Sequence, residues 1–313
     1  MKKHIEVRRY LLASALLLVS TAWAFAADGP DVEKRKTYSK SYSISATDKV
    51  NINNQFGEVK IVTWGKNEVK VDVTIVAKAG SEERAQSILD NIKIEDSKSG
   101  NEVSFKTNMG KEESKGDRKT RNNESQGMQI DYEVSMPAGN PLDLQNQFGK
   151  TFVPDMSGPV EISQKFGDLV VGNLTDIKEL HVEFGSLVAE SISNCKVVVK
   201  FSKAEIKKMN GSIKGNFEFC DKVKLPLDNN VTDFTLNNSY SKIEIAVTSS
   251  FGGNFEIHTS FGEFKNGSAL AIKEEKDDDD NHGPRFDKDF VGKTGNGACK
   301  VKIHSSFGTI KFI

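Results

Sequence analysis

The feature that most constrains this chain is a Phe-Gly step that recurs between short runs of alternating apolar residues. It occurs at Phe56-Gly57, Phe148-Gly149, Phe166-Gly167, Phe184-Gly185, Phe261-Gly262 and Phe307-Gly308. Before each Phe the apolar residues lie at even offsets, as in Leu180, Val182 and Phe184. A period of two is typical of a β-strand with one buried face. The sequence therefore predicts a series of similar strand pairs.

The parity of the pattern changes at each Phe-Gly step. After Phe184 the apolar residues are Leu187 and Ala189, which lie at odd offsets. A straight strand cannot do this, because a slip of one residue turns every side chain to the other face. Glycine tolerates the backbone angles of a bend, so we expect a corner there, with both strand segments and the Phe facing one core. Ser202 and Ser241 replace Gly after Phe201 and Tyr240, and a milder bend is expected at both.

The spacing of the motif predicts how the strand pairs are arranged. Phe148, Phe166, Phe184, Phe201 and Phe219 are 18, 18, 17 and 18 residues apart, and Tyr240 and Phe261 follow at intervals of 21. A fixed short period is typical of stacked units. We therefore predict an all-β fold, a parallel β-solenoid of coils of about 18 to 21 residues stacked ~4.8 Å apart, with the Phe side chains aligned inside it. An antiparallel meander is the alternative, but the turns lack regular Asn-Gly hairpin signals.

A polar residue often occupies the position two residues before the motif Phe. The examples are Asn54, Asn146, Gln164, Asn238, Thr259 and Ser305. The alternation directs these side chains inward, where they can hydrogen-bond between coils. The other interpretation is that the position lies at an open, solvated corner. The sequence leaves both open.

The first 26 residues are predicted to be a signal peptide. Basic residues precede the apolar run "YLLASALLLVSTAWAF", and "AFA" ending at Ala26 fits a cleavage site. No later segment is long and apolar enough to span a bilayer. We therefore expect an exported protein that is periplasmic, on the outer-membrane surface or secreted, without a transmembrane span after cleavage.

The remainder is predicted to have two parts. Residues 27–136 hold strands, one short helix that starts at Ser81, and a polar loop at 110–127. This small α+β region is expected to cap one end of the stack, because the open edge of a solenoid must be covered. Residues 137–313 hold the solenoid repeats, with an acidic insertion at 273–297.

Two groups of residues are weak candidates for metal binding. Asp277, Asp279 and Asn281 offer alternate oxygen ligands of the kind that Ca²⁺ prefers, without the spacing of a complete EF-hand loop. His258 and His304 each lie three residues before a motif Phe and point outward, on coils expected to be neighbours. They lack an evident third ligand. A solvated loop and a surface coincidence are the alternatives, and we expect no metal or other cofactor. The three cysteines are expected to be small buried side chains, with at most one disulfide among them.

No motif in the sequence identifies a reaction. The outward residues at one shared offset mix charge signs: Asp168, Ser186, Lys203, Lys242, Glu263 and Thr309. A glycosidase needs paired carboxylates instead. The sequence has no G-x-S-x-G, H-E-x-x-H or phosphate loop, so we predict that the protein is not an enzyme. The net charge of −1 gives no electrostatic reason to expect nucleic acid.

The recurrent Phe-Gly coils behind a signal peptide resemble the putative adhesin family of bacterial envelope proteins (DUF4097, with the related DUF2807). The resemblance covers approximately residues 40 to 313 and rests on the Phe-Gly steps given above, with Phe201 and Tyr240 at degenerate copies. It implies a parallel β-solenoid and an envelope role, without catalytic residues. The acidic insertion and the long polar loop depart from the family pattern.

These observations favour an exported, non-enzymatic envelope scaffold that binds a polysaccharide or protein partner. A carbohydrate-active enzyme on the same scaffold and an envelope sensor or regulatory accessory protein are the alternatives. Adjacent outward carboxylates along a groove would favour the enzyme.

Overall fold

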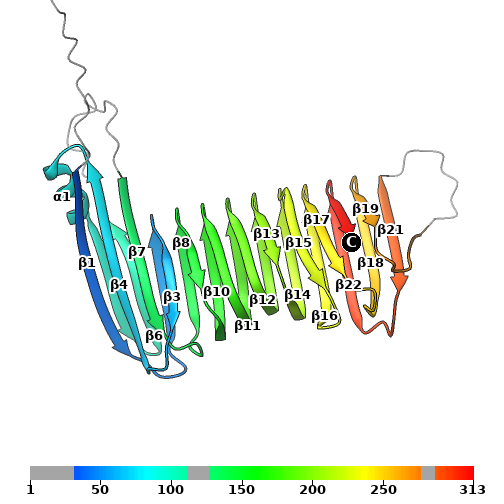
Figure 1. Ribbon diagram of the computed structural model, residues 1–313, viewed down its shortest axis with the longest axis horizontal. Helices are drawn as coiled ribbons and strands as arrows, with labels where there is room; N and C mark the ends of the chain where they lie inside the picture. The colour runs from blue at the N-terminus through cyan, green and yellow to red at the C-terminus, as the bar shows by residue number, and fades with distance from the viewer. Residues whose placement is uncertain (1–31, 111–126, 276–285) are drawn as a thin grey trace, which may run out of the picture.

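The computed structural model describes residues 32–110, 127–275 and 286–313. Its strands form one continuous, mostly parallel assembly that rises coil by coil along the long axis of the molecule (Figure 1). The predicted parallel β-solenoid is confirmed, since the central coils pair in parallel register, for example Leu180 with both Ile162 and Val197. The antiparallel meander is thereby excluded for these coils.

One wall of the stack contains the strand segments that precede the motif Phe, together with β5 and β6 at one end and β21 and β20 at the other. Its order is β5-β6-β2-β8-β10-β11-β12-β14-β16-β22-β18-β21-β20. The bounds are β5 Ile92–Ser99, β6 Glu102–Met109, β2 Lys49–Gln55, β8 Leu142–Gln147, β10 Met156–Lys165, β11 Asp168–Glu183, β12 Ser186–Lys200, β14 Met209–Glu218, β16 Val231–Ser239, β22 Cys299–Ser306, β18 Gly253–Ser260, β21 Asp287–Lys293 and β20 Ile272–Glu274.

The other wall contains the segments that follow the motif, together with β1, β4 and β7 at its N-terminal end. Its order is β1-β4-β7-β3-β9-β11-β12-β13-β15-β17-β23-β19, and the long strands β11 and β12 contribute to both walls. The further bounds are β1 Val32–Ser43, β4 Glu68–Ala79, β7 Gly127–Met136, β3 Val59–Thr63, β9 Thr151–Val153, β13 Lys203–Ile206, β15 Lys222–Leu227, β17 Lys242–Val247, β23 Thr309–Phe312 and β19 Glu263–Asn266.

The core lies between the two walls and consists of columns of inward side chains. One column runs through in-register positions of nine strands, with a glycine at one step. Its members are Ile52, Leu144, Ile162, Leu180, Val197, Gly215, Leu236, Ile303 and Ile257. The apolar members are at most 2% exposed, and each such side chain contributes about 2 to 3 kcal/mol of burial free energy. Stacking is required because a single coil would leave both of its open faces in water.

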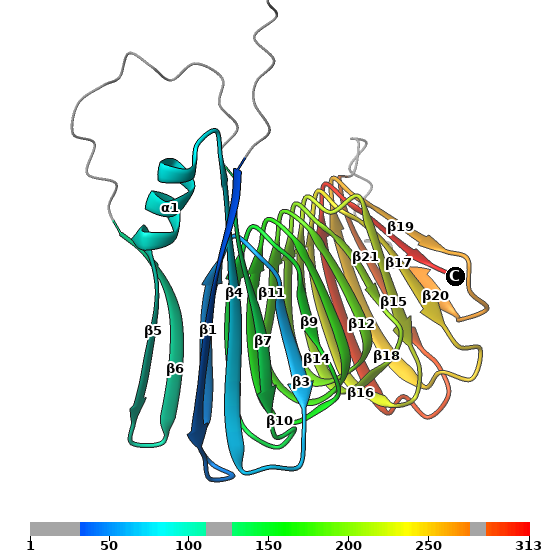
Figure 2. The same ribbon diagram turned by 60° about the vertical axis from the view of Figure 1, so that its left-hand side comes forward.

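The N-terminal end carries the only helix of the described residues, α1 (Glu82–Asn91). As predicted, Ser81 is its N-cap and accepts a hydrogen bond from the Arg84 amide, while Ala85 and Leu89 are buried. Figure 2 shows α1 above the β5–β6 hairpin and beside β1 and β4. β1, β4, β5 and β6 form antiparallel pairs there, so the end of the stack is covered as expected.

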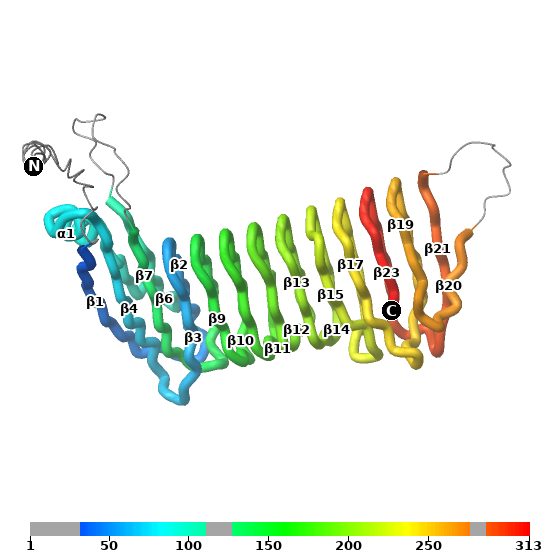
Figure 3. Tube along the Cα trace, turned by 45° about the horizontal axis from the view of Figure 1, so that its top comes forward, coloured from blue at the N-terminus to red at the C-terminus, as the bar shows by residue number. Residues whose placement is uncertain are grey.

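The order of the C-terminal coils departs from the order of the chain. The final coil, β22–β23, lies between the β16–β17 coil and the β18–β19 coil. In Figure 3 the red β23 lies between the yellow β17 and the orange β19. The chain therefore passes one coil position by, forms the outer coil and β21, and returns to fill the gap.

The predicted division at residues 136 and 137 stays a prediction. The signal peptide, most of the polar loop at 110–127 and residues 276–285 of the acidic insertion at 273–297 lie outside the described residues.

Candidate functional site

The motif aromatic residues, together with Phe286 of the C-terminal end, form a row along one corner of the solenoid. As predicted, they line up on a shared axis: successive ring centroids are 4.7 to 5.1 Å apart and the ring planes differ by at most 16°. We call this row the aromatic ridge. Its members, in spatial order, are Phe56, Phe148, Phe166, Phe184, Phe201, Phe219, Tyr240, Phe307, Phe261 and Phe286.

The prediction that these rings lie inside the core is wrong. From Phe148 to Phe286 the ridge side chains are 44% to 55% exposed, and Phe56 is half-buried. The cause is the backbone of the motif residue itself, since φ lies between 49° and 65° at each motif aromatic. This left-handed conformation ends the alternation of an extended strand. The residue expected inside therefore turns to the surface.

The role predicted for the motif glycine also changes. Gly57, Gly149, Gly167 and Gly185 do not carry the positive φ. A Cβ at Gly167 would lie 1.8 Å from the carbonyl oxygen of Gly149 in the next coil, and one at Gly185 would lie 1.9 Å from that of Gly167. The glycines are therefore required by the close approach of neighbouring backbones.

The milder bend expected at Ser202 and Ser241 is not found. Phe201 and Tyr240 have φ of 49° and 51°, like the other copies. Both serines are buried, and their hydroxyls accept hydrogen bonds from the Gly185 and Cys220 amides of a neighbouring coil. A serine can therefore replace the motif glycine, because its hydroxyl oxygen accepts a hydrogen bond from the backbone amide of the neighbouring coil.

The polar residues two positions before the motif Phe are buried and hydrogen-bonded between coils. All six are at most 2% exposed. The Asn54 amide donates to Asn146 Oδ1, the Asn146 amide donates to the Gly57 carbonyl oxygen, and Asn238 donates to Ser305 Oγ at 2.8 Å. Of the two open interpretations, the inter-coil hydrogen bonds are confirmed. Such buried groups specify register, because a slipped coil would leave them unsatisfied.

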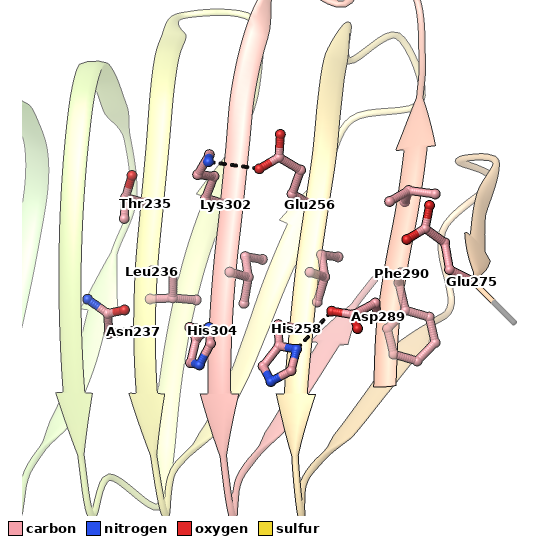
Figure 4. Close-up of a pocket in the computed structure, with 13 residues that line it drawn as sticks. Thr235, Leu236, Asn237, Glu256, His258, Glu275, Asp289, Phe290, Lys302 and His304 are labelled. Carbon is pink, nitrogen blue, oxygen red and sulfur yellow. Dashed lines mark hydrogen bonds and ion pairs between the residues drawn. The ribbon is translucent and has the colours of Figure 1, made fainter. Parts of the chain in front are cut away.

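A groove of about 400 Å³ opens on the outer surface of the first wall near its C-terminal end. Three neighbouring strands, β16, β22 and β18, form its floor, and β21 forms one side (Figure 4). We call it the C-terminal groove. Its polar lining comprises Thr235, Asn237, Glu256, His258, Glu275, Asp289, Lys302 and His304.

Four side chains of the C-terminal groove form two pairs, Lys302 with Glu256 and His258 with Asp289. Lys302 Nζ lies 2.8 Å from a Glu256 carboxylate oxygen, and this ion pair lowers the pKa of Glu256 and raises that of Lys302. His258 Nδ1 lies 2.8 Å from Asp289 Oδ1. The ring of His258 also stacks on His304, with centroids 4.5 Å apart. The groove thus offers hydrogen-bonding groups and imidazole rings on a fixed strand spacing.

His258 and His304 are neighbours, as the sequence predicts. Within residues 32–110, 127–275 and 286–313, no cluster of three or more His, Cys, Asp or Glu side chains could hold a metal ion. Asp277, Asp279 and Asn281 lie outside the described residues. The structure therefore adds no third ligand to the histidine pair, and the hypothesis at Asp277, Asp279 and Asn281 stays a prediction. His181, which lies three residues before Phe184, has a lowered pKa because burial disfavours its charged form.

Cys195, Cys220 and Cys299 are free and buried. Burial raises the pKa of the Cys195 thiol to about 12, so this thiol stays protonated and does not provide a nucleophile at neutral pH.

A hydrogen-bonded cluster near the N-terminal end of the stack was not predicted from the sequence. The hydroxyls of Tyr38 and Tyr42 in β1 both donate to the carboxylate of Asp96 in β5. They connect the two walls where the stack begins, and they lower the pKa of Asp96. Tyr38 and Tyr42 lie on the inward side of β1, opposite the buried Val73 and Val69 of β4. Asp96 is 58 and 54 residues away from them in the chain, and this separation gives no sequence signal for the contact.

Comparisons with known proteins find distant similarity to solved structures. No family model matches the chain, and no curated protein matches it. A structure titled "putative lipid binding protein" from Parabacteroides distasonis has a TM-score of 0.40 at 12% identity, covering 88% of this chain and 96% of that one. Putative adhesins from Parabacteroides distasonis and Bacteroides fragilis give TM-scores of 0.34 and 0.28 at 11% and 14% identity. Each covers 89% of this chain and 97% of the other. Likenesses this low assign neither a family nor an activity.

Among the described residues, no helix has the length and apolar character needed to cross a membrane.

Proposed function

We propose that this protein is an exported, non-enzymatic scaffold of the cell envelope that binds an extended polar partner, a polysaccharide or a protein segment, at the C-terminal groove. The observation that carries the proposal is the groove itself, an open site that crosses three parallel strands. Equivalent positions of neighbouring strands recur every ~4.8 Å across the floor of the groove. A polymer can therefore contact several coils at once.

The chemistry of the groove suits recognition of hydroxyl and amide groups. Asn237, Thr235 and the Glu256–Lys302 pair present donors and acceptors from adjacent strands, and the ion pair holds the Glu256 and Lys302 side chains in place. The stacked imidazoles of His258 and His304 add a flat, partly apolar side. Polar groups held in place on rigid elements lower the entropic cost of binding.

A carbohydrate-active enzyme is the second candidate, because Glu256, Glu275 and Asp289 do line one groove. A glycosidase requires one carboxyl held protonated as a general acid. The ion pair with Lys302 lowers the pKa of Glu256, which keeps this carboxyl ionised. Release of reducing ends from envelope polysaccharides by the purified chain would favour the enzyme over the scaffold.

The test is binding to a glycan array and to purified envelope proteins, with paired variants. Glu256→Gln together with Lys302→Gln removes the groove pair without changing net charge. Glu244→Gln with Lys311→Gln is the matched control, because it removes a similar pair on the other wall. We expect the groove variant to weaken binding at least tenfold (~1.4 kcal/mol) and the control to bind as the wild type does. Both screens returning empty, or equal binding by the two variants, would contradict the proposal.

A further inference from the structure

The aromatic ridge exposes more apolar surface than a free protein usually presents. Half of an aromatic side chain of ~200 Å² remains in water at each of nine rings, which gives on the order of 900 Å² in one row. The largest apolar patch on a typical monomer is about 300 to 600 Å². Among the described residues, nine of the twelve exposed large hydrophobic side chains belong to this row. The ridge is therefore a candidate docking surface separate from the C-terminal groove.

A row of lysines flanks the centre of the ridge. Lys203, Lys222 and Lys242 are exposed and follow Phe201, Phe219 and Tyr240 by two or three residues. Lys203 pairs in register with Lys222, and the pairing of Val223 with Ile243 places Lys222 beside Lys242. We call these three residues the lysine row.

The lysine row has no evident structural role. Like charges directly opposite each other on neighbouring strands are destabilising. Other lysines of the stack have partners, such as Lys200 with Glu218 at 2.6 Å. In the part of the chain that the structure describes, no ion pair involves Lys203, Lys222 or Lys242. Asp221 is the acidic residue in the turn between Phe219 and Lys222. Its single negative charge does not neutralise the three lysines, so the lysine row has a net positive charge.

We propose that the aromatic ridge and the lysine row together dock the protein on an anionic lipid surface. A straight row of aromatic side chains beside lysines matches the surface of a bilayer, where anionic headgroups lie above apolar acyl chains. The ridge rings stack face to face at about 5 Å, so their faces are covered and their edges meet the solvent. A sugar ring stacks on an aromatic face, whereas acyl chains accept an aromatic edge. The ridge therefore favours lipid over an acidic polysaccharide, and it leaves the C-terminal groove free.

The test is flotation of the purified chain lacking residues 1–26 with vesicles of phosphatidylcholine alone or mixed with phosphatidylglycerol. We expect binding only to the mixed vesicles, weakened by salt. Lys203→Gln, Lys222→Gln and Lys242→Gln combined should reduce the partition coefficient roughly 100-fold, about fivefold for each lysine. Lys178→Gln, Lys208→Gln and Lys214→Gln combined are the control, because they remove the same charge from exposed positions away from the ridge. This control should bind within about twofold of the wild type.

Insertion of the ridge itself is measured with a fluorescent variant. Phe219→Trp in a Trp64→Phe background places one indole in the row, and brominated lipids should quench it on mixed vesicles. Lack of binding to mixed vesicles, equal binding by the two lysine variants, or an unquenched indole would each overturn the proposal. Binding to an immobilised acidic polysaccharide with no vesicle binding would overturn it in favour of that partner. None of these results depends on the C-terminal groove, so they leave the proposed function separately testable.

Discussion

Replacing Phe184 tests whether the motif aromatic is a surface residue in a left-handed backbone conformation. Its ring is stacked between Phe166 and Phe201 at 5.0 and 4.9 Å and is 44% exposed, with φ of 57°. Two substitutions separate the side chain from the backbone. Alanine removes the ring and keeps the strained φ, while glycine removes the ring and relieves the strain.

The expected magnitudes follow from the exposed fraction. Somewhat over half of ~200 Å² is removed from water, and at ~25 cal/mol per Å² this contributes about 2.8 kcal/mol. Since the alanine methyl keeps part of that burial, Phe184→Ala should lower the free energy of unfolding by about 2 kcal/mol. A left-handed residue other than glycine costs about 1 to 2 kcal/mol. After the flexibility cost of glycine, Phe184→Gly should be about 0.5 to 1 kcal/mol more stable than Phe184→Ala.

Urea unfolding followed by circular dichroism measures this order, with variants of Val182 as controls. Val182 is buried in the extended part of β11, so there alanine should be more stable than glycine by about 0.5 to 1 kcal/mol. The reasoning is refuted if glycine is the less stable residue at both positions. A loss of more than about 4 kcal/mol for Phe184→Ala, at the upper end for a fully buried ring, would also refute it.

Three further predictions concern the stacking of the coils. Gly167→Ala should destabilise the protein by more than about 3 kcal/mol, because its Cβ would lie 1.8 Å from a neighbouring carbonyl oxygen, whereas Gly65→Ala meets nothing within 4 Å and should be neutral in a thermal melt. Thr151→Val should cost about 1 to 3 kcal/mol in urea unfolding, because it leaves the buried Gln164 Oε1 without its 2.5 Å hydrogen bond; a neutral result would contradict the buried polar contact. The folded pKa of Asp96 is lowered by two tyrosine hydroxyls, so its stabilisation is present above the unfolded pKa of about 3.9 and is lost as pH falls through the folded value. The stability difference between wild type and Asp96→Asn should therefore shrink in acid, and a difference that grows there would contradict the contact.

The stacking of coils could be predicted because spacing and alternation are direct consequences of strand geometry. Equal intervals from Phe148 to Phe219 require equal coils, and the change of parity requires a corner. The direction of the rings could not be predicted in the same way. The inward–outward alternation of side chains holds only for extended backbone. The motif aromatic residue has a left-handed φ, so the alternation does not predict the direction of its own side chain.

The spatial order of the last coils could not be predicted from the sequence either. The coils of Phe261 and Phe307 carry the same motif, so either order satisfies the alternation equally well. The exchange places β22 between β16 and β18, and it brings His304 and Lys302 into the C-terminal groove. The other side of the groove comes from β21. This strand lacks the repeat motif, so nothing in the sequence indicated that it would line a groove.

Hydroxyl-radical footprinting with mass spectrometry tests the central structural claim most directly, because it compares phenylalanines of one chain under one condition. We expect oxidation at ridge residues such as Phe166 and Phe219, and protection at Phe217 and Phe234, which are 1% exposed. Equal protection of all four would contradict an exposed aromatic ridge and, with it, the lipid-docking surface.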